Sequence, residues 1–243
     1  MQKNKTTRYW TEDINLEWYK RQFREPYRIT VAFRDFLKQN INIKNDKILD
    51  IGCGTGSALD YIAKAYPDAV FTGLDINSEL FEMYEGSAQN IHFRKGDCFA
   101  LDDEIIDMFD GVISLQTLSW LPEWRTPLKE ICKIRPRWIA VSSLFYPGKI
   151  NYTISLENYE RPAQGANFSQ VYYNVYSVPL IKEQLEQSGY NRFVYQPFVI
   201  DIDIKKPEHY DLGYYTIRDE TGKRMAFNTC LFQPEGFIFA SLE

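Results

Sequence analysis

Cysteine and histidine are scarce in this sequence of 243 residues. Its four cysteines form no C-x-x-C pair, and its only histidines are His92 and His209. Neither a zinc site nor a disulfide framework is indicated, so we expect no bound metal. Cysteines without a pairing pattern fit a reducing compartment, which favours the cytoplasm.

A long hydrophobic run is also missing. No segment approaches the roughly 18 apolar residues that a membrane span requires. The N-terminal segment MQKNKTTR is polar and lacks the apolar stretch of a secretory signal. The sequence therefore predicts a soluble protein that neither enters a membrane nor is exported.

Basic residues are in short supply. The 28 Lys and Arg are outnumbered by 33 Asp and Glu, which gives a net charge of -5 and a pI near 5.3. Proteins that bind nucleic acid carry an excess of positive charge, because they must neutralise phosphates. A nucleic-acid partner is therefore not expected.

The segment Lys47–Tyr66, KILDIGCGTGSALDYIAKAY, organises the rest of the chain. Residues 47–51 are an apolar run that predicts a strand, residues 52–56 a tight turn, and residues 57–65 an amphipathic helix that stops before Pro67. A strand, a glycine loop and a helix form the opening of a nucleotide-binding βαβ unit.

The spacing of the glycines argues against a dinucleotide. The pattern G-x-G-x-x-G/A would need Gly or Ala at position 57, where this chain has Ser57. The chain has D-x-G-x-G-x-G instead, with Asp50 two residues before Gly52. A carboxylate at that place would repel a pyrophosphate and would hold an ammonium group. Asp50 therefore favours a cationic cofactor.

This segment resembles motif I of the class I S-adenosylmethionine-dependent methyltransferases. The resemblance implies that the backbone of Gly52, Cys53, Gly54 and Gly56 approaches the methionine part of the cofactor and that Asp50 lies near its amino group. S-adenosyl-L-methionine would then be the methyl donor and S-adenosyl-L-homocysteine the product.

Further cofactor contacts are expected after the next two strands, which a helix over about residues 78–85 should connect. The strand 69–74 ends in Asp75, followed by Ile76, and an acidic residue at this tip can bind the two hydroxyls of a ribose. After the strand 91–95, the family commonly has an Asp that meets the adenine amino group, and the resemblance carries this role to Asp97 with Cys98. A simple Gly-Asp turn is the alternative for Asp97.

The segment after the fourth strand, 109–115, should face the reacting methyl group. Ligands of such sheets lie outside the carboxyl ends of the strands where the strand order reverses. We therefore expect Leu115 and Gln116 beside the cofactor and Trp120 beside the acceptor.

The same segment lacks two signatures. It has no acidic-or-Asn-Pro-Pro-aromatic tetrapeptide of nucleic-acid base methyltransferases, and no carboxylates for a metal of the catechol-type enzymes. The wording LQTLSWLPEW is similar to the corresponding segment of methyltransferases that act on small carboxylic acids and related metabolites.

Residues 146–177 interrupt the fold between a fifth strand, 137–145, and a helix, 178–187. Long connections on the ligand side of a sheet are usually lids or binding loops. This one is rich in Tyr and Asn, and we expect Tyr146, Tyr173, Asn174 and Tyr176 to contact the acceptor. A tyrosine ring attracts a cation and its hydroxyl can bond to an acceptor, although each ring could instead pack the lid on the sheet.

The predicted fold is α/β, a Rossmann-like doubly wound sheet of seven strands in the order 3-2-1-4-5-7-6. Two helices should precede it, a long sixth strand should cover 192–204, a hairpin 214–227, and the last strand 237–241. We expect a single domain, residues 1–243, in four parts: N-terminal helices at 1–45, a cofactor-binding core at 46–145, an acceptor-site lid at 146–177, and a C-terminal helix with strands and an extra hairpin at 178–243.

The sequence therefore predicts a methyltransferase that acts on oxygen or nitrogen of a small polar metabolite, such as a carbohydrate-pathway intermediate or a carboxylic acid. A protein or peptide methyltransferase and a non-catalytic cofactor-binding partner subunit are the alternatives. A hydroxyl or ammonium acceptor needs a general base, whereas a carboxylate does not. His209 is the candidate base, and His92, inside a strand, is expected to be structural. The oligomeric state is left open.

Overall fold

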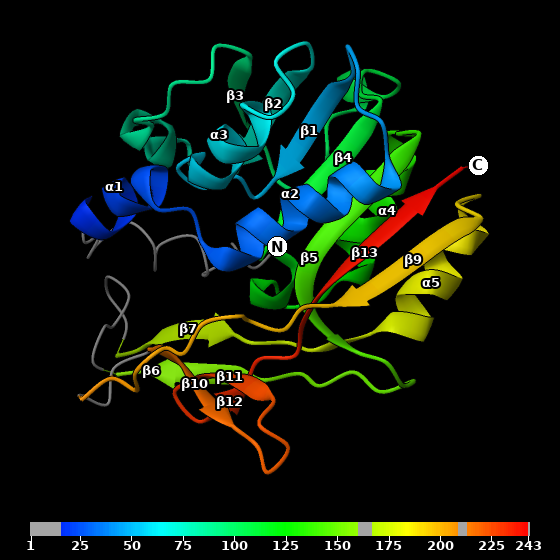
Figure 1. Cartoon of the computed structure of the whole chain (residues 1–243). Helices are drawn as coiled ribbons and strands as arrows, with labels where there is room; N and C mark the ends of the chain where they lie inside the picture. The colour runs from blue at the N-terminus through cyan, green and yellow to red at the C-terminus, as the bar shows by residue number, and fades with distance from the viewer. Residues whose placement is uncertain (1–15, 160–166, 209–212, 243) are drawn as a thin grey trace.

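The computed structural model describes residues 16–159, 167–208 and 213–242, with the side chains of residues 16–19 left out. Its centre is a mixed sheet with the strand order β3-β2-β1-β4-β5-β13-β9, to which β8 adds beside β5 (Figure 1). The strands are β1 (Lys47–Ile51), β2 (Val70–Asp75), β3 (Ile91–Lys95), β4 (Gly111–Leu115), β5 (Trp138–Tyr146), β8 (Tyr176–Ser177), β9 (Arg192–Pro197) and β13 (Glu235–Ser241). This confirms the predicted order, with β9 and β13 as its sixth and seventh strands.

The direction of β13 places its first residue at the site. Strands β1 to β5 run parallel, whereas β13 runs antiparallel to both β5 and β9. The amino end of β13 therefore lies at the same edge of the sheet as the carboxyl ends of the parallel strands. We call this edge the carboxyl edge.

Helices cover both faces of the sheet (Figure 1). The α-helices are α1 (Leu16–Arg24), α2 (Arg28–Asn40), α3 (Ser57–Ala63), α4 (Arg125–Lys133) and α5 (Val178–Gln187), and the 3-10 helices are η2 (Ser78–Met83), η3 (Asp103–Ile105) and η4 (Leu118–Trp120). In the ranges that the structure describes, no helix is long and apolar enough to cross a membrane.

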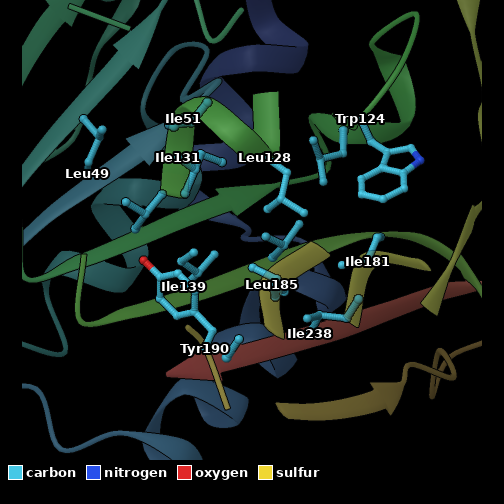
Figure 2. Packing of buried hydrophobic residues seen from close by; sticks show 14 of the residues in the cluster. Leu49, Ile51, Trp124, Leu128, Ile131, Ile139, Ile181, Leu185, Tyr190 and Ile238 are labelled. Carbon is cyan, nitrogen blue, oxygen red and sulfur yellow. The ribbon is translucent and has the colours of Figure 1, made fainter. Parts of the chain in front are cut away.

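Each face of the sheet packs its own hydrophobic core. On one face, side chains of β1, β5 and β13 meet α4 and α5, as Leu128, Ile131 and Ile181 show in Figure 2. On the other face, α2 and α3 pack against the same strands, with Phe33 and Phe237 completely buried between them. Both layers hold the carboxyl edge in a fixed geometry.

The segment after β2 departs from the prediction. An α-helix was expected over 78–85, but η2 is a short 3-10 helix. The cause is Asp60 of α3, whose Oδ1 accepts hydrogen bonds from the Tyr84 hydroxyl at 2.9 Å and from the backbone N–H groups of Ser87 at 2.8 Å and Ala88 at 2.9 Å. These bonds hold the chain in an extended path and prevent a further helical turn.

The sixth strand is also shorter than predicted. The expected strand 192–204 pairs with β13 only as far as Pro197, which stands opposite Gly236, because β13 begins one residue earlier, at Glu235. Pro234, directly before it, has no N–H for a ladder hydrogen bond.

Two small sheets lie against the carboxyl edge of the large one (Figure 1). The insertion forms β6 (Ser155–Asn158) and β7 (Ser169–Tyr172), which pair antiparallel. The predicted hairpin is confirmed as β10 (Tyr214–Arg218) and β11 (Arg224–Asn228), and β12 (Leu231–Phe232) adds a third strand.

Replacing Phe33 tests the core between α2 and the sheet. Its ring lies 5.5 Å from that of Phe237 and is fully buried. We expect Phe33→Ala to lower the free energy of unfolding by about 3–5 kcal/mol, through lost burial and the cavity it leaves. Urea unfolding measures the change. Met108→Ala, at a residue that is 47% exposed, should stay within about 0.5 kcal/mol of the parent, and equal losses in both variants would contradict this packing.

Candidate functional site

The glycine loop after β1 is shaped for the close approach of a ligand. Its first turn is tied to β2, since the N–H groups of Gly52 and Cys53 donate to the Leu74 carbonyl at 2.8 and 3.2 Å. Gly52 has φ +77°, and a Cβ there would lie 2.3 Å from Thr117 Oγ1. Gly54 has φ +56°, and a Cβ there would meet nothing within 4 Å. Space over the backbone is therefore present at Gly54.

Asp50 lies in the buried part of β1, one residue before its end, and is only 2% exposed. Within the described residues its Oδ1 is buried and has no hydrogen-bond partner. Burial, and secondly the nearby Asp75, raises the pKa of this carboxyl to about 8. A buried unsatisfied carboxylate is costly, and an ammonium group would supply both the charge and the hydrogen bonds that it lacks. The site thus fits the amino group of S-adenosylmethionine.

Asp75 lies on the other side of the loop. Its Oδ2 accepts from Gly54 N–H at 3.0 Å and its Oδ1 from Asn77 N–H at 2.9 Å. Burial raises the pKa of Asp75, and these N–H groups oppose that effect. Each carboxylate oxygen keeps a further lone pair, so the residue can accept from ribose hydroxyls while Ile76 follows it along the same edge.

Asp97 and Cys98 follow the end of β3, next to β2. The Asp97 carboxylate accepts from the N–H of Phe99 at 2.9 Å, so it also forms the turn that the alternative reading predicts. Cys98 packs against the core, and burial raises the pKa of its thiol to about 12, which keeps it neutral. Adenine recognition by this pair stays a prediction.

Leu115 and Gln116 end β4 at the same edge. Gln116 has φ +55°, and its Nε2 donates to Ser142 Oγ of β5 at 2.9 Å. The structure therefore brings all eleven predicted cofactor contacts to the carboxyl ends of β1 to β4: Asp50, Gly52, Cys53, Gly54, Gly56, Asp75, Ile76, Asp97, Cys98, Leu115 and Gln116.

Helix α1 lies beside the start of α3 (Figure 1). Ser57 Oγ donates to Gln22 Oε1 at 3.2 Å, and Lys20 forms an ion pair with Glu85 at 2.8 Å. The N-terminal segment therefore covers the helix that follows the glycine loop.

The predicted acceptor residues fall into two groups. Trp120 of η4 contacts Tyr173 of the insertion, with 4.6 Å between ring centroids, and Tyr146 contacts Tyr152 at 5.5 Å. Asn174, by contrast, is completely buried: its Oδ1 accepts from Ile154 N–H, and its Nδ2 donates to the Leu121 carbonyl and to the Tyr176 hydroxyl. These bonds give Asn174 and Tyr176 a role in fastening the insertion to the segment after β4, and their contact with an acceptor stays a prediction.

Four residues at this edge were not predicted as site residues: Ser142, Tyr214, Asn228 and Glu235. The Tyr214 hydroxyl donates to Glu235 Oε2 at 2.7 Å, and Tyr214 stands opposite Asn228 in the β10–β11 ladder. Asn228 Nδ2 in turn donates to the Tyr173 hydroxyl at 2.9 Å. Their contacts come from elements far apart in sequence, and no local motif signals them.

These contacts close into a circuit that we call the acceptor ring. Trp120 packs on Tyr173, which accepts a hydrogen bond from Asn228, and Asn228 pairs with Tyr214 in the β10–β11 ladder. Tyr214 donates to Glu235 at the start of β13, and β13 pairs with β5, the strand of Ser142. Ser142 accepts from Gln116, which lies in the same segment as Trp120. The members of the acceptor ring are Gln116, Trp120, Ser142, Tyr173, Tyr214, Asn228 and Glu235.

Neither histidine is found at the site within the described residues. His92 is exposed on the edge strand β3, and His209, the candidate base, lies outside the described residues. A search of the described ranges finds no group of three or more His, Cys, Asp or Glu side chains that could hold a metal.

Gly54→Ala tests the open space over the loop. Gly222, in the β10–β11 turn, is a matched control, because it too has positive φ and nothing within 4 Å of an added Cβ. Each alanine should cost about 1–2 kcal/mol of stability through its left-handed backbone. Only Gly54→Ala should weaken S-adenosylhomocysteine binding, by about tenfold or more, in calorimetric titration. Equal affinities in the two variants would mean that no ligand approaches Gly54.

The raised pKa of Asp50 predicts a pH dependence of binding. An ammonium ligand stabilises the ionised carboxylate, so binding must expel the proton that Asp50 carries below pH about 8. Affinity for S-adenosylhomocysteine should therefore fall about tenfold or more from pH 8 to pH 6. Asp50→Asn should bind weakly at both values, and 5′-methylthioadenosine, which has no ammonium group, should show no such fall. A pH-independent affinity for S-adenosylhomocysteine would remove Asp50 from the ammonium site.

Comparison with known proteins places this geometry in a family. Residues 48–135 match the model of a methyltransferase domain. The chain is 28% identical over 96 residues to a fatty-acid O-methyltransferase of Mycolicibacterium smegmatis, covering 38% of this chain and 34% of that protein. It is 33% identical over 79 residues to a trans-aconitate 2-methyltransferase of Deinococcus radiodurans, covering 32% of this chain and 29% of that protein. The matches thus span only about a third of these relatives.

Among solved structures, the N-terminal domain of EvdMO1 with S-adenosylhomocysteine bound superposes with a TM-score of 0.53 at 15% identity, over 88% of this chain and 81% of that one. That likeness shows the fold. Taken with the matched domain model and the sheet order, it confirms the resemblance that the glycine loop predicted. The matched domain at residues 48–135 and the strand order of the sheet are those of the class I S-adenosylmethionine-dependent methyltransferases.

Proposed function

We propose that the chain transfers a methyl group from S-adenosylmethionine to oxygen or nitrogen of a small polar metabolite. The observation that carries the proposal is the buried Asp50 carboxylate with an unpartnered Oδ1, next to the open backbone at Gly54. A sulfonium cofactor that carries an ammonium group meets both features. A pyrophosphate would be repelled by the Asp50 carboxylate.

The residues of the carboxyl edge divide the binding of the cofactor among them. Asp50 holds the ammonium group, the glycine loop lies along the methionine part, Asp75 receives the ribose, and Asp97 with Cys98 flanks the adenine. When bound, the cofactor supplies an activated methyl group. The chain aligns that group with the acceptor, and alignment of this kind is worth up to ~7–11 kcal/mol.

The insertion supports a small acceptor. Asn174 and Tyr176 fasten it to the Leu121 carbonyl, and Tyr173 of the same segment packs on Trp120. A wall built in this way over the carboxyl edge suits a metabolite better than an extended peptide, which needs an open groove. Fatty acids and trans-aconitate, the acceptors in the names of two relatives, and carbohydrate-pathway intermediates are the first compounds to test.

Calorimetric titration with three adenosine-containing compounds tests the cofactor directly. S-adenosylmethionine and S-adenosylhomocysteine should bind with about micromolar Kd, near -8 kcal/mol, and NAD should show no heat of binding. The first two share the ammonium group that Asp50 requires. NAD instead places a pyrophosphate at the loop.

Two other outcomes would contradict the proposal. Binding of NAD without either sulfur compound would overturn the assignments at Asp50, Asp75 and Asp97 together. Binding of S-adenosylhomocysteine with no methyl transfer to any fraction of a metabolite extract would favour the non-catalytic cofactor-binding subunit.

A further inference from the structure

Glu235 is a buried carboxylate at the carboxyl edge without a cationic partner. Its side chain is 8% exposed, and its Oε2 accepts from the Tyr214 hydroxyl at 2.7 Å. Within the described residues no Lys, Arg or His forms an ion pair with it, and no donor reaches its other oxygen, Oε1. The packing of β13 alone does not require a charged group at this place, because its neighbours on the strand are apolar.

The register of the sheet places Glu235 at the carboxyl edge, on the same face as Ser142 and Leu115. Along β13, Phe237 stands opposite Ser142 of β5, and Glu235 stands opposite Leu144, one step nearer the edge. Ser142 is in turn level with Leu115 of β4. Directly opposed residues share a face of the sheet. Strands are about 4.8 Å apart, so β4 and β13 are separated by roughly 10 Å, which a small metabolite can bridge.

A second unpartnered acceptor belongs to the same ring. Asn228 Oδ1 is buried without a hydrogen-bond partner in the described residues, while its Nδ2 is occupied by the Tyr173 hydroxyl. Asn228 stands opposite Tyr214, the residue that donates to Glu235. Tyr214 therefore links the strand pair that carries Asn228 to Glu235. A buried acceptor without a donor, such as Asn228 Oδ1, is unfavourable unless a ligand supplies the donor.

We infer that Glu235 is the general base of this enzyme and that the methyl acceptor is an amine or a hydroxyl compound, whose N–H or O–H group is held by Glu235 and Asn228. The inference rests on the proposed methyl transfer and narrows its acceptor class. A carboxylic-acid acceptor has no such donor at neutral pH, and its negative charge would be repelled by an ionised Glu235. Of the compounds to be tested under the proposed function, the inference therefore expects no methyl transfer to fatty acids or trans-aconitate.

The electrostatics of Glu235 suit this role. Burial raises the pKa of its carboxyl to about 7, while the hydrogen bond from Tyr214 works in the opposite direction. A base with a pKa close to the working pH combines a useful ionised fraction with a strong enough affinity for the proton. Tyr214 holds one oxygen in place and leaves Oε1 for the acceptor, so it is a positioning residue.

The step balances without any further reactant. The acceptor X–H gives its proton to Glu235 Oε1, and its lone pair forms the new X–CH3 bond. The bond between the methyl carbon and the sulfonium sulfur breaks, and its electron pair stays on sulfur as neutral S-adenosylhomocysteine. The proton on Glu235 then passes to water.

Alkali stability of the transferred methyl group tests the acceptor class. The wild-type chain is incubated with [methyl-³H]S-adenosylmethionine and a small-molecule extract, and the products are heated in alkali. Methyl esters release volatile ³H-methanol, whereas N-methyl and ether products keep their label. We expect the label to stay non-volatile. Label that is wholly volatile would identify a carboxylate acceptor and overturn the inference.

The variant Glu235→Gln tests the base. Its amide keeps the size of the side chain and can still accept from Tyr214. We expect transfer to fall at least about 100-fold with S-adenosylhomocysteine affinity within twofold of the parent. Tyr214→Phe should fall less, about tenfold, and Glu186→Gln, on the exposed side of α5, should match the parent. Full activity in Glu235→Gln would refute the inference. If the parent itself did not bind S-adenosylhomocysteine, the proposed function would be refuted instead.

A readout without turnover uses the protein saturated with S-adenosylhomocysteine and labelled at the glutamate carboxyl carbons with ¹³C. Methylammonium should shift the Glu235 resonance, identified by its absence in Glu235→Gln, and acetate should not. A Glu235 resonance that methylammonium leaves unchanged would show that this carboxylate is closed to cationic acceptors and would count against the inference.

Discussion

The burial of one carboxylate, Asp50, is the constraint on which the rest of the site depends. Ionisation of a carboxyl group that is only 2% exposed and lacks a partner on Oδ1 is unfavourable unless a cation compensates it. The strand and the glycine loop hold this carboxyl group at the edge where the parallel strands end. A cofactor that brings an ammonium group therefore relieves a cost built into the free protein, and a neutral or anionic one does not.

Local sequence was sufficient to predict the cofactor half of the molecule. The strand, the glycine loop and the helix at 47–66 are each set by short-range pattern, so their predicted positions agree with β1 and α3 to within two residues. Helix α5 was predicted at its observed bounds, because Ser177 accepts from Leu180 N–H and a proline follows in the first turn. In these segments local propensity and tertiary packing favour the same conformation.

Prediction failed where a partner comes from a distant element. Glu235 looks like an ordinary polar residue before an apolar strand, and only the contact with Tyr214, 21 residues earlier, reveals its burial. The expected helix at 78–85 is a 3-10 helix that ends at Met83, because Asp60 of α3 accepts hydrogen bonds from Tyr84 and Ser87 in the segment that follows. Asn174 was expected at the acceptor because of its residue type; its amide holds the insertion, and its contact with an acceptor stays a prediction. Residue type alone does not tell a binding amide from a fastening one.

The antiparallel direction of β13 has a consequence for how the molecule can diverge. The predicted cofactor contacts come from residues 50–116, whereas most of the acceptor ring comes from the chain after Trp120 and closes only with the final strand. The matched domain model ends at residue 135, before most of that second wall. Under the proposed function, the residues that bind the methyl donor and those that bind the acceptor come from separate parts of the sequence. Mutations in the second part can then change the acceptor without altering the binding of the donor. Sequence similarity over residues 48–135 therefore gives no information about which acceptor the later residues bind.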